Sequence, residues 1–130
     1  MDIRVYYEDL DAGGVVYHAN YIKYMARGRT EYLREQGLSQ DLSERGYVFP
    51  VVRLEIDYLA PAVHDDLLRV ETAVLAIGKT SITFEQRIVR AADGKVLTNA
   101  KVTLVCADLQ GKAKKLPAEL LRTLHSAQKS

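Results

Sequence analysis

The chain has 130 residues, of which 48% are hydrophobic; this is enough for one compact domain and too short for two ordinary ones. We therefore expect residues 1–130 to form a single domain. Eighteen basic and seventeen acidic residues nearly cancel, so the net charge of +1 gives no field that favours nucleic acid or an anionic membrane as a partner. No apolar run approaches the ~20 residues that span a bilayer, so no transmembrane segment is expected.

The single cysteine, Cys106, cannot form a disulfide within the chain, and the first residues lack the apolar stretch of a signal peptide. Both features favour the cytoplasm. Cys106 and the three histidines do not have the ligand spacing of a zinc site, so we expect neither a metal nor another cofactor.

The N-terminal third predicts a strand, a loop and a helix. A short strand is expected at about Ile3–Tyr7, followed by a loop at Asp11–Gly14, whose two glycines permit backbone conformations closed to other residues. Asn20 is a suitable N-cap for a helix that runs to about Gln36, and Gly37 suits its end.

The predicted helix has one apolar face, on which Tyr21, Met25, Gly28 and Tyr32 follow helical spacing. Gly28 costs about 1 kcal/mol relative to alanine in an exposed helix interior. We therefore expect another backbone to approach the helix closely at Gly28, as in a helix pressed into a curved sheet.

From Val48 onward, hydrophobic residues recur at every second position, which is typical of strands. Apolar residues alternate with charged ones until Pro61 breaks the run: Val52, Leu54, Ile56 and Tyr58 against Arg53, Glu55 and Asp57. Three more strands and a short terminal helix are expected at Leu68–Ile77, Ser81–Arg90, Val96–Ala107 and about Pro117–Leu124, with turns at Gly78-Lys79 and Asp93-Gly94.

One strand, a long helix and four further strands form an α+β pattern in which an antiparallel sheet wraps a helix. Regular edge strands of this kind pair with another chain unless some feature blocks them, so self-association is expected.

The segment Tyr6–Tyr21 combines a carboxylate, two glycines, an imidazole and a helix start within about a dozen residues. Asp11 can act as a nucleophile or a general base, and the first turn of a helix offers unpaired N–H groups to an oxyanion. Taken alone, an Asp before Gly-Gly is more often a turn former, and His18 would be an exposed loop residue.

The pattern R-V-Y-Y-E-D-x-D-A-G-G-V-V-Y-H-A-N-Y from Arg4 to Tyr21 resembles the signature of the YbgC-like branch of the 4-hydroxybenzoyl-CoA thioesterase family. The resemblance continues through the helix segment Tyr24–Leu33. Leu10 departs from it, since the family usually has Thr or Cys before the active Asp. The resemblance implies a hotdog fold, with a five-stranded antiparallel sheet wrapped around a central long helix. It also implies a homodimer whose sheets join edge to edge, or a homotetramer.

The resemblance also implies roles for three site residues. Asp11 attacks the thioester or activates the water that does. The backbone N–H of His18 is the oxyanion donor, and its imidazole binds the substrate or helps to protonate the leaving thiolate. Tyr7 matches a Tyr that pairs with the Asp and the His, although a strand Tyr is more often a core residue. Glu31, on the helix, is a rival carboxylate, because another hotdog branch carries its acid there.

Two basic segments are candidates for binding the phosphates of coenzyme A. The first is the turn formed by Lys79, Thr80 and Ser81, and the second is the cluster Lys112, Lys114 and Lys115. Clusters of this kind are usually only solvated loops.

The predicted function is that of an acyl-CoA thioesterase without a cofactor, which releases a free acid and coenzyme A from a short-chain aliphatic or aromatic acyl-CoA. An acyl carrier protein could present the same pantetheine arm. Two alternatives stay open: a hotdog dehydratase acting on a hydroxyacyl thioester, and a thioester-binding or scaffold protein of an envelope-associated complex.

Overall fold

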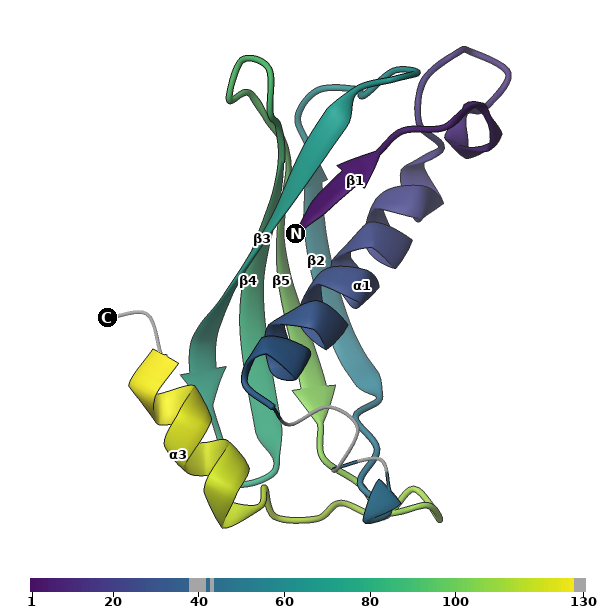
Figure 1. Ribbon diagram of the computed structural model, residues 1–130. Coiled ribbons are helices and arrows are strands. Elements are labelled where there is room, and N and C mark those ends of the chain that lie inside the picture. Colours follow the sequence, from purple (N-terminus) through teal and green to yellow (C-terminus); the bar gives the residue numbers. More distant parts are fainter. Residues whose placement is uncertain (38–41, 43, 128–130) are drawn as a thin grey trace.

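The computed structural model describes residues 1–37, 42 and 44–127, and it contains a five-stranded sheet in the order β1-β3-β4-β5-β2. Every neighbouring pair is antiparallel. The elements are β1 (Asp2–Arg4), η1 (Tyr7–Asp9), α1 (His18–Glu35), β2 (Val51–Tyr58), β3 (Leu67–Ile77), β4 (Ser81–Arg90), β5 (Val96–Val105) and α3 (Ala118–Ala127). In Figure 1, α1 crosses one face of the sheet, and α3 lies at the end where β3 finishes. The α+β class and the strand pattern are as expected.

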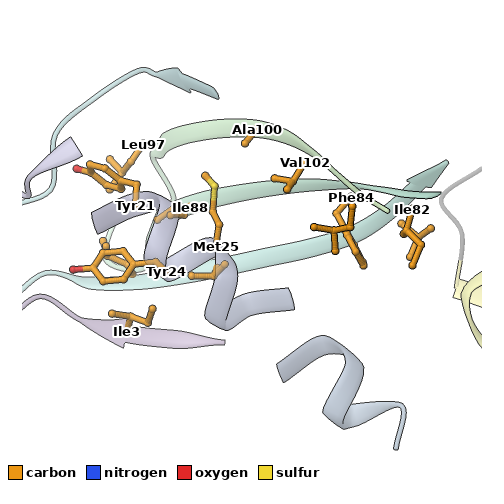
Figure 2. Packing of buried hydrophobic residues seen from close by; sticks show 14 of the residues in the cluster. Ile3, Tyr21, Tyr24, Met25, Ile82, Phe84, Ile88, Leu97, Ala100 and Val102 are labelled. Carbon is orange, nitrogen blue, oxygen red and sulfur yellow. The ribbon is translucent and has the colours of Figure 1, made fainter. Parts of the chain in front are cut away.

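The core lies between α1 and the sheet, because alternate residues of β3, β4 and β5 point toward the helix. Figure 2 shows Tyr21 and Met25 of α1 among side chains of β4 and β5. Phe84 is fully buried, and the strand register places it between Val74 and Val102. α3 extends this cluster through Leu120 and Leu124, which are also fully buried. None of the described helices is both long and apolar enough to cross a membrane.

Gly28 faces the centre of the sheet, where side chains rather than backbone approach it. A Cβ at this position would lie 2.7 Å from Val70 Cγ1, 3.1 Å from Gln86 Nε2 and 3.2 Å from Thr72 Oγ1. The expected close approach is therefore present, but the expectation of a neighbouring backbone is wrong. The buried amide of Gln86 uses this space, because its Nε2 donates to the Met25 carbonyl (2.9 Å) and to Thr72 Oγ1 (2.9 Å).

The first strand is shorter than predicted, since β1 ends at Arg4 and residues Tyr7–Asp9 form a 3-10 turn. The Asp9 carboxylate causes this change of direction, because its Oδ2 accepts the N–H of Tyr6 (2.8 Å). A side chain that bonds nearby backbone competes with a strand ladder.

The helix begins earlier than predicted, at His18, with Tyr17 at the N-cap position and no side-chain cap. Asn20 is therefore not the N-cap. Its Nδ2 instead donates to Oδ1 of Asp9 (3.2 Å), which joins the first turn of α1 to the 3-10 turn. The predicted helix end is accurate to about one residue, and Gly37 has the positive φ of 75° that suits a residue after a helix.

The sheet strands are close to their predicted positions, with small differences at their ends. β5 ends at Val105, two residues before the predicted end, although the N–H of Cys106 still donates to the Thr80 carbonyl (2.6 Å) in the register of the β4–β5 pair. β2 starts at Val51, and Val48 forms only an isolated bridge with Ala107.

Candidate active site

A pocket of about 350 Å³ lies where the Asp11 loop, the start of α1 and the end of β2 meet. Its lining residues are Asp11, Val15, Val16, His18, Tyr21, Tyr58, Leu59, Ala60 and Pro61. A somewhat larger pocket of about 400 Å³ lies between the second half of α1 and the segment 47–49. The smaller pocket is the candidate site, because it is the one that brings a carboxylate, an imidazole and a helix N-terminus together.

The Asp11 loop is closed by its own backbone. The N–H of Asp11 donates to the Val15 carbonyl (2.9 Å), and the N–H of Gly14 donates to the Asp11 carbonyl (3.1 Å). Gly14 has a φ of 80°, which glycine adopts without strain. Gly13 donates its N–H to Asp11 Oδ1 (2.8 Å), and a Cβ on Gly13 would come within 3.2 Å of that oxygen. The N–H of Gly13 therefore holds Oδ1 of Asp11, and Gly14 supplies the positive φ that the turn requires.

The two carboxylate oxygens of Asp11 are in different situations. Oδ1 accepts the Gly13 N–H and so stabilises the turn, which is the common role of an Asp before Gly-Gly. Oδ2 accepts no hydrogen bond from the residues that the structure describes, and Asp11 lines the pocket. The turn and a chemical role are thus compatible, because each can use its own oxygen.

His18 is the first residue of α1, and its backbone N–H belongs to the first turn, where a helix has no internal acceptor. That N–H has no acceptor among the described residues. The imidazole is exposed and lies between two tyrosines, with ring centroids 4.5 Å from Tyr17 and 6.3 Å from Tyr58. The positive end of the helix dipole therefore faces the pocket that contains the Asp11 carboxylate.

Two tyrosines at the site were not identified from the sequence. Tyr58 donates its hydroxyl to the His18 carbonyl (3.0 Å), so the end of β2 is tied to the start of α1. Tyr21 is buried, and its hydroxyl accepts the N–H of Ala62 (3.0 Å). Burial raises the pKa of Tyr21, although the Ala62 N–H acts in the opposite direction, so the phenol is neutral at physiological pH. Both residues looked like ordinary core positions, because periodicity shows which face a residue is on and not which hydroxyl it bonds.

Two other predicted candidates lie outside this pocket. Tyr7 is 79% exposed, and its ring stands edge-on to that of His64 at 5.7 Å, so the structure does not bring it among the residues that line the pocket. Glu31 forms an exposed ion pair with Arg34 on α1. The rival carboxylate is therefore engaged elsewhere on the helix.

The predicted phosphate-binding residues Lys79, Thr80 and Ser81 lie at the β3–β4 turn. This turn is at the opposite end of β3 from Leu67–Arg69, which pair with β1 beside the Asp11 loop. The second basic segment lies next to the first, because the N–H of Leu116 donates to the Lys79 carbonyl (3.1 Å). The structure thus joins the two basic candidates to each other, but not to Asp11.

No group of three or more His, Cys, Asp or Glu side chains that could hold a metal occurs within residues 1–37, 42 and 44–127. Cys106 is a free and buried thiol, and burial raises its pKa. The groups in the pocket are therefore a carboxylate, an imidazole and main-chain N–H donors, which suit attack on a polarised carbonyl.

Comparison with known proteins supports the same chemistry. The family model of the thioesterase-like superfamily matches residues 5–124. The chain is 46% identical over 127 residues to the acyl-CoA thioesterase YbgC of Haemophilus influenzae, covering 95% of this chain and 91% of that protein. It is 44% identical over 122 residues to the acyl-CoA thioester hydrolase YbgC of Escherichia coli O6:H1, covering 92% and 90%.

The chain belongs to the YbgC-like acyl-CoA thioesterase family. The resemblance seen in the segment 4–33 and the prediction of a thioester hydrolase are thereby confirmed. A solved structure of a 1,4-dihydroxy-2-naphthoyl-CoA thioesterase from Synechocystis superimposes with a TM-score of 0.88 at 25% identity, covering 96% of this chain and 93% of that one. The hotdog fold is confirmed as well.

Proposed function

We propose that this chain hydrolyses acyl-CoA thioesters in the Asp11 pocket and releases a free acid and coenzyme A. The observation that carries the proposal is the pairing of two free groups at one pocket. The Oδ2 oxygen of Asp11 is unoccupied by hydrogen bonds from the described residues, and the N–H of His18 at the start of α1 is an unused donor. A carboxylate and an oxyanion donor are the two elements that acyl transfer requires.

The thioester carbonyl oxygen accepts a hydrogen bond from the N–H of His18. Asp11 then promotes attack on the carbonyl carbon by one of two routes. As a general base, Asp11 takes a proton from water while the water oxygen adds to that carbon. As a nucleophile, it adds directly and forms an anhydride, which water then opens. In both routes the C–S bond breaks and the thiolate of coenzyme A leaves with the electron pair. The His18 imidazole helps to protonate that thiolate or orients the substrate.

We propose short-chain aliphatic or aromatic acyl groups as substrates. The pocket volume of about 350 Å³ and the apolar wall of Leu59, Ala60 and Pro61 support this size and character. The structurally similar Synechocystis protein is named for an aromatic acyl-CoA. We also propose an acyl carrier protein as an alternative donor of the acyl group, since its pantetheine arm is the same as that of coenzyme A.

We also propose a homodimer, or a tetramer built from it, in which the β2 edges pair. A two-fold axis makes two identical edge strands antiparallel. The partner's Val51 end, which lies at the same end of the sheet as the turn of Lys79, Thr80 and Ser81, would then face the Asp11 pocket. This arrangement supports the assignment of that turn to the phosphates of coenzyme A.

The lone thiol of Cys106 fits a reducing compartment, and we propose the cytoplasm.

The test is release of free thiol from a panel of acetyl-, butyryl-, hexanoyl-, decanoyl- and benzoyl-CoA. Asp11→Asn, which is nearly isosteric, should lower kcat by at least ~10²-fold, the scale of a lost base or nucleophile, because an amide can neither take a proton nor attack. Glu31→Gln is the control and should keep most of the activity, since its carboxylate lies outside the pocket.

Each other outcome of the panel has a clear meaning. Near-wild-type turnover in a folded Asp11→Asn enzyme would remove Asp11 from the mechanism. Binding of acyl-CoA without turnover by the wild-type protein would favour a scaffold. A 3-hydroxybutyryl-CoA added to the panel tests the remaining alternative, because its conversion to an enoyl product would favour a dehydratase.

A further inference from the structure

The apolar wall of the Asp11 pocket belongs to the loop between β2 and β3, residues 59–66. Leu59, Ala60 and Pro61 line the pocket, while Ala62 and Val63 contact the segment that follows the Asp11 turn. The Ala62 carbonyl accepts the N–H of Val16 (2.9 Å), and Val15 forms a bridge with Val63. The position of the 59–66 loop therefore affects two sides of the pocket at once.

The two halves of this loop are anchored differently. At its far end, Val5 exchanges two main-chain hydrogen bonds with Asp65 and Asp66 (3.0 and 2.9 Å). At its near end, Leu59 and Ala60 donate to the Leu97 carbonyl (2.8 and 3.2 Å). Pro61, between them, has no N–H to donate, so its carbonyl is its only strong polar group.

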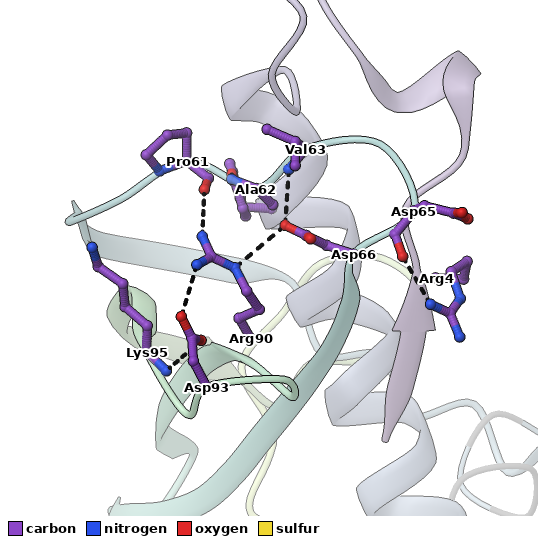
Figure 3. Close-up of polar contacts among 10 residues, drawn as sticks. Arg4, Pro61, Ala62, Val63, Asp65, Asp66, Arg90, Asp93 and Lys95 are labelled. Carbon is purple, nitrogen blue, oxygen red and sulfur yellow. Dashed lines mark hydrogen bonds and ion pairs between the residues drawn. The ribbon is translucent and has the colours of Figure 1, made fainter.

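Arg90 adds a side-chain contact at Pro61, beside the bonds that Val16 and Tyr21 form with Ala62. It is the last residue of β4, and Figure 3 shows its guanidinium between the loop and the β4–β5 hairpin. Nη2 donates to the Pro61 carbonyl (3.2 Å), and Nη1 donates to Oδ2 of Asp93 (3.0 Å). Nε lies 3.4 Å from Oδ2 of Asp66, an ion pair without hydrogen-bond geometry.

The Asp66 carboxylate carries the effect of Arg90 further along the loop. The oxygen that faces Arg90, Oδ2, also accepts the N–H of Val63 (3.0 Å). Side chains of Arg90 and Asp66 are only 24% and 19% exposed, so this pair is less screened by water than an ordinary surface pair. The fork of an arginine can hold several acceptors in fixed directions, whereas a lysine cannot.

Arg90 itself is not among the residues that line the pocket. We propose that Arg90 is a positioning residue: by holding Pro61 and Asp66 against the β4–β5 hairpin, it fixes the apolar wall of the Asp11 pocket and so determines which acyl groups fit. The assignment of this wall to the acyl group rests on the proposed function. Selectivity among acyl chains is then set from outside the pocket, by a side chain that never touches the substrate.

The chain offers a matched control for this proposal. Arg87 is in the same strand and is also paired with a carboxylate, since it donates to Glu71 Oε1 from Nε and Nη2 (3.0 and 2.7 Å). Its side chain is 47% exposed and lies on the face of the sheet away from α1. Arg87→Gln removes the same charge from β4 without touching the 59–66 loop.

The experiment compares Arg90→Gln, Arg90→Lys and Arg87→Gln by kcat/KM on the acyl-CoA panel. In Arg90→Gln, the ratio of kcat/KM for the best straight-chain substrate to that for the next longer one in the panel should fall by roughly fivefold or more, because a loosened wall discriminates chain length less well. The ratio measured for Arg90→Lys should lie between the ratios of the wild type and of Arg90→Gln. The pH dependence of kcat/KM should stay unchanged in all three variants, because Asp11 and His18 are intact, and Arg87→Gln should keep the wild-type ratio.

Hydrogen exchange gives a second readout that needs no substrate. The amides of Ala62 and Val63 should exchange at least about threefold faster in Arg90→Gln than in wild type, while Arg87→Gln leaves them unchanged. Wild-type selectivity in a folded Arg90→Gln enzyme overturns the proposal, even if the variant is less stable, since a purely stabilising role would lower stability alone. If Arg90→Gln does not fold, Arg90→Lys and Asp93→Asn decide by the same two readouts.

Failure of the wild-type protein to hydrolyse any thioester would instead count against the proposed function, and the exchange experiment would still test the positioning by Arg90.

Discussion

Asp11 shows how one side chain can be both structural and reactive. Its Oδ1 is used by the N–H of Gly13, and this bond holds the carboxylate in place, while Oδ2 is left for a reaction partner. A carboxylate that is fixed before the substrate arrives loses less rotational freedom when it reacts. The turn is therefore part of the machinery that the proposed function requires.

The side chain of His18 should matter less than that of Asp11. His18→Ala keeps the main-chain N–H at the start of α1 and removes only the imidazole, so we expect kcat to fall by roughly 10- to 10²-fold. A thiolate is a good leaving group and needs little protonation, which limits the loss. The measurement is kcat for both variants on the best panel substrate, with circular dichroism to confirm folding. Equal inactivity of His18→Ala and Asp11→Asn would move the essential proton transfer to the imidazole.

Tyr21 should stabilise the pocket through its hydroxyl. Tyr21→Phe keeps the buried ring but leaves the N–H of Ala62 without its acceptor, which should cost about 1–2 kcal/mol of unfolding free energy. Urea denaturation measures this loss. Tyr32→Phe is the matched control, because the buried Tyr32 hydroxyl has no hydrogen-bond partner among the described residues, and its removal should be neutral or slightly stabilising. Equal effects of the two changes would contradict this account.

At the level of elements, α1 is fitted to the sheet at Gly28. Val70, Thr72 and Gln86 occupy the space that a side chain at this position would need. Gly28→Leu should therefore destabilise the protein by at least ~2 kcal/mol, although leucine is the better helix former by nearly 1 kcal/mol. Lys23→Leu, at an exposed position of the same helix, should stay within about 0.5 kcal/mol of wild type. Thermal or urea unfolding compares the two, and a neutral Gly28→Leu would show that α1 can move away from the sheet at little cost.

The sequence predicted the elements well where a long period of two or 3.6 residues was present, as in α1, β3 and β4. It failed where a single side chain redirects the backbone. Asp9 is the clearest case, because its bonds to the N–H of Tyr6 and to Asn20 shorten β1 and make Asn20 an internal helix residue. Contacts of this kind depend on residues that meet only in the folded state, so a linear pattern contains no direct sign of them.

The same limit applies to the candidate site. A contiguous motif brought Asp11 and His18 to attention, and both line one pocket. The other wall comes from Tyr58 to Pro61, forty residues later, and its support by Arg90 comes from a third element. A strand end followed by Ala-Pro-Ala suggested only a break in the sheet. Local sequence could show the reactive groups, but not the residues that shape the space around them.

For the whole molecule, the two edges of the sheet are unequal. β1 is a three-residue strand that offers little to a partner, whereas β2 is an eight-residue edge. Along or beside β2, Val52 and Leu59 are 59% and 60% exposed. A long apolar edge invites pairing with another chain unless it is blocked. This edge also runs past the Asp11 pocket at Tyr58, so pairing there would bring a second chain to the site.

Assembly through β2 can be tested by light scattering coupled to gel filtration. We expect at least a dimer at micromolar concentration, because pairing of the two edges buries exposed apolar side chains and satisfies open backbone groups together. Val52→Glu should weaken the dimer by at least tenfold in Kd, since each subunit would bury a charge in the paired edge, and a loss of this size corresponds to about 1.4 kcal/mol. Leu109→Glu is the control, because Leu109 is 72% exposed but lies after β5 and off the edge. A wild-type monomer, or equal weakening by both changes, would rule out β2 as the dimer edge.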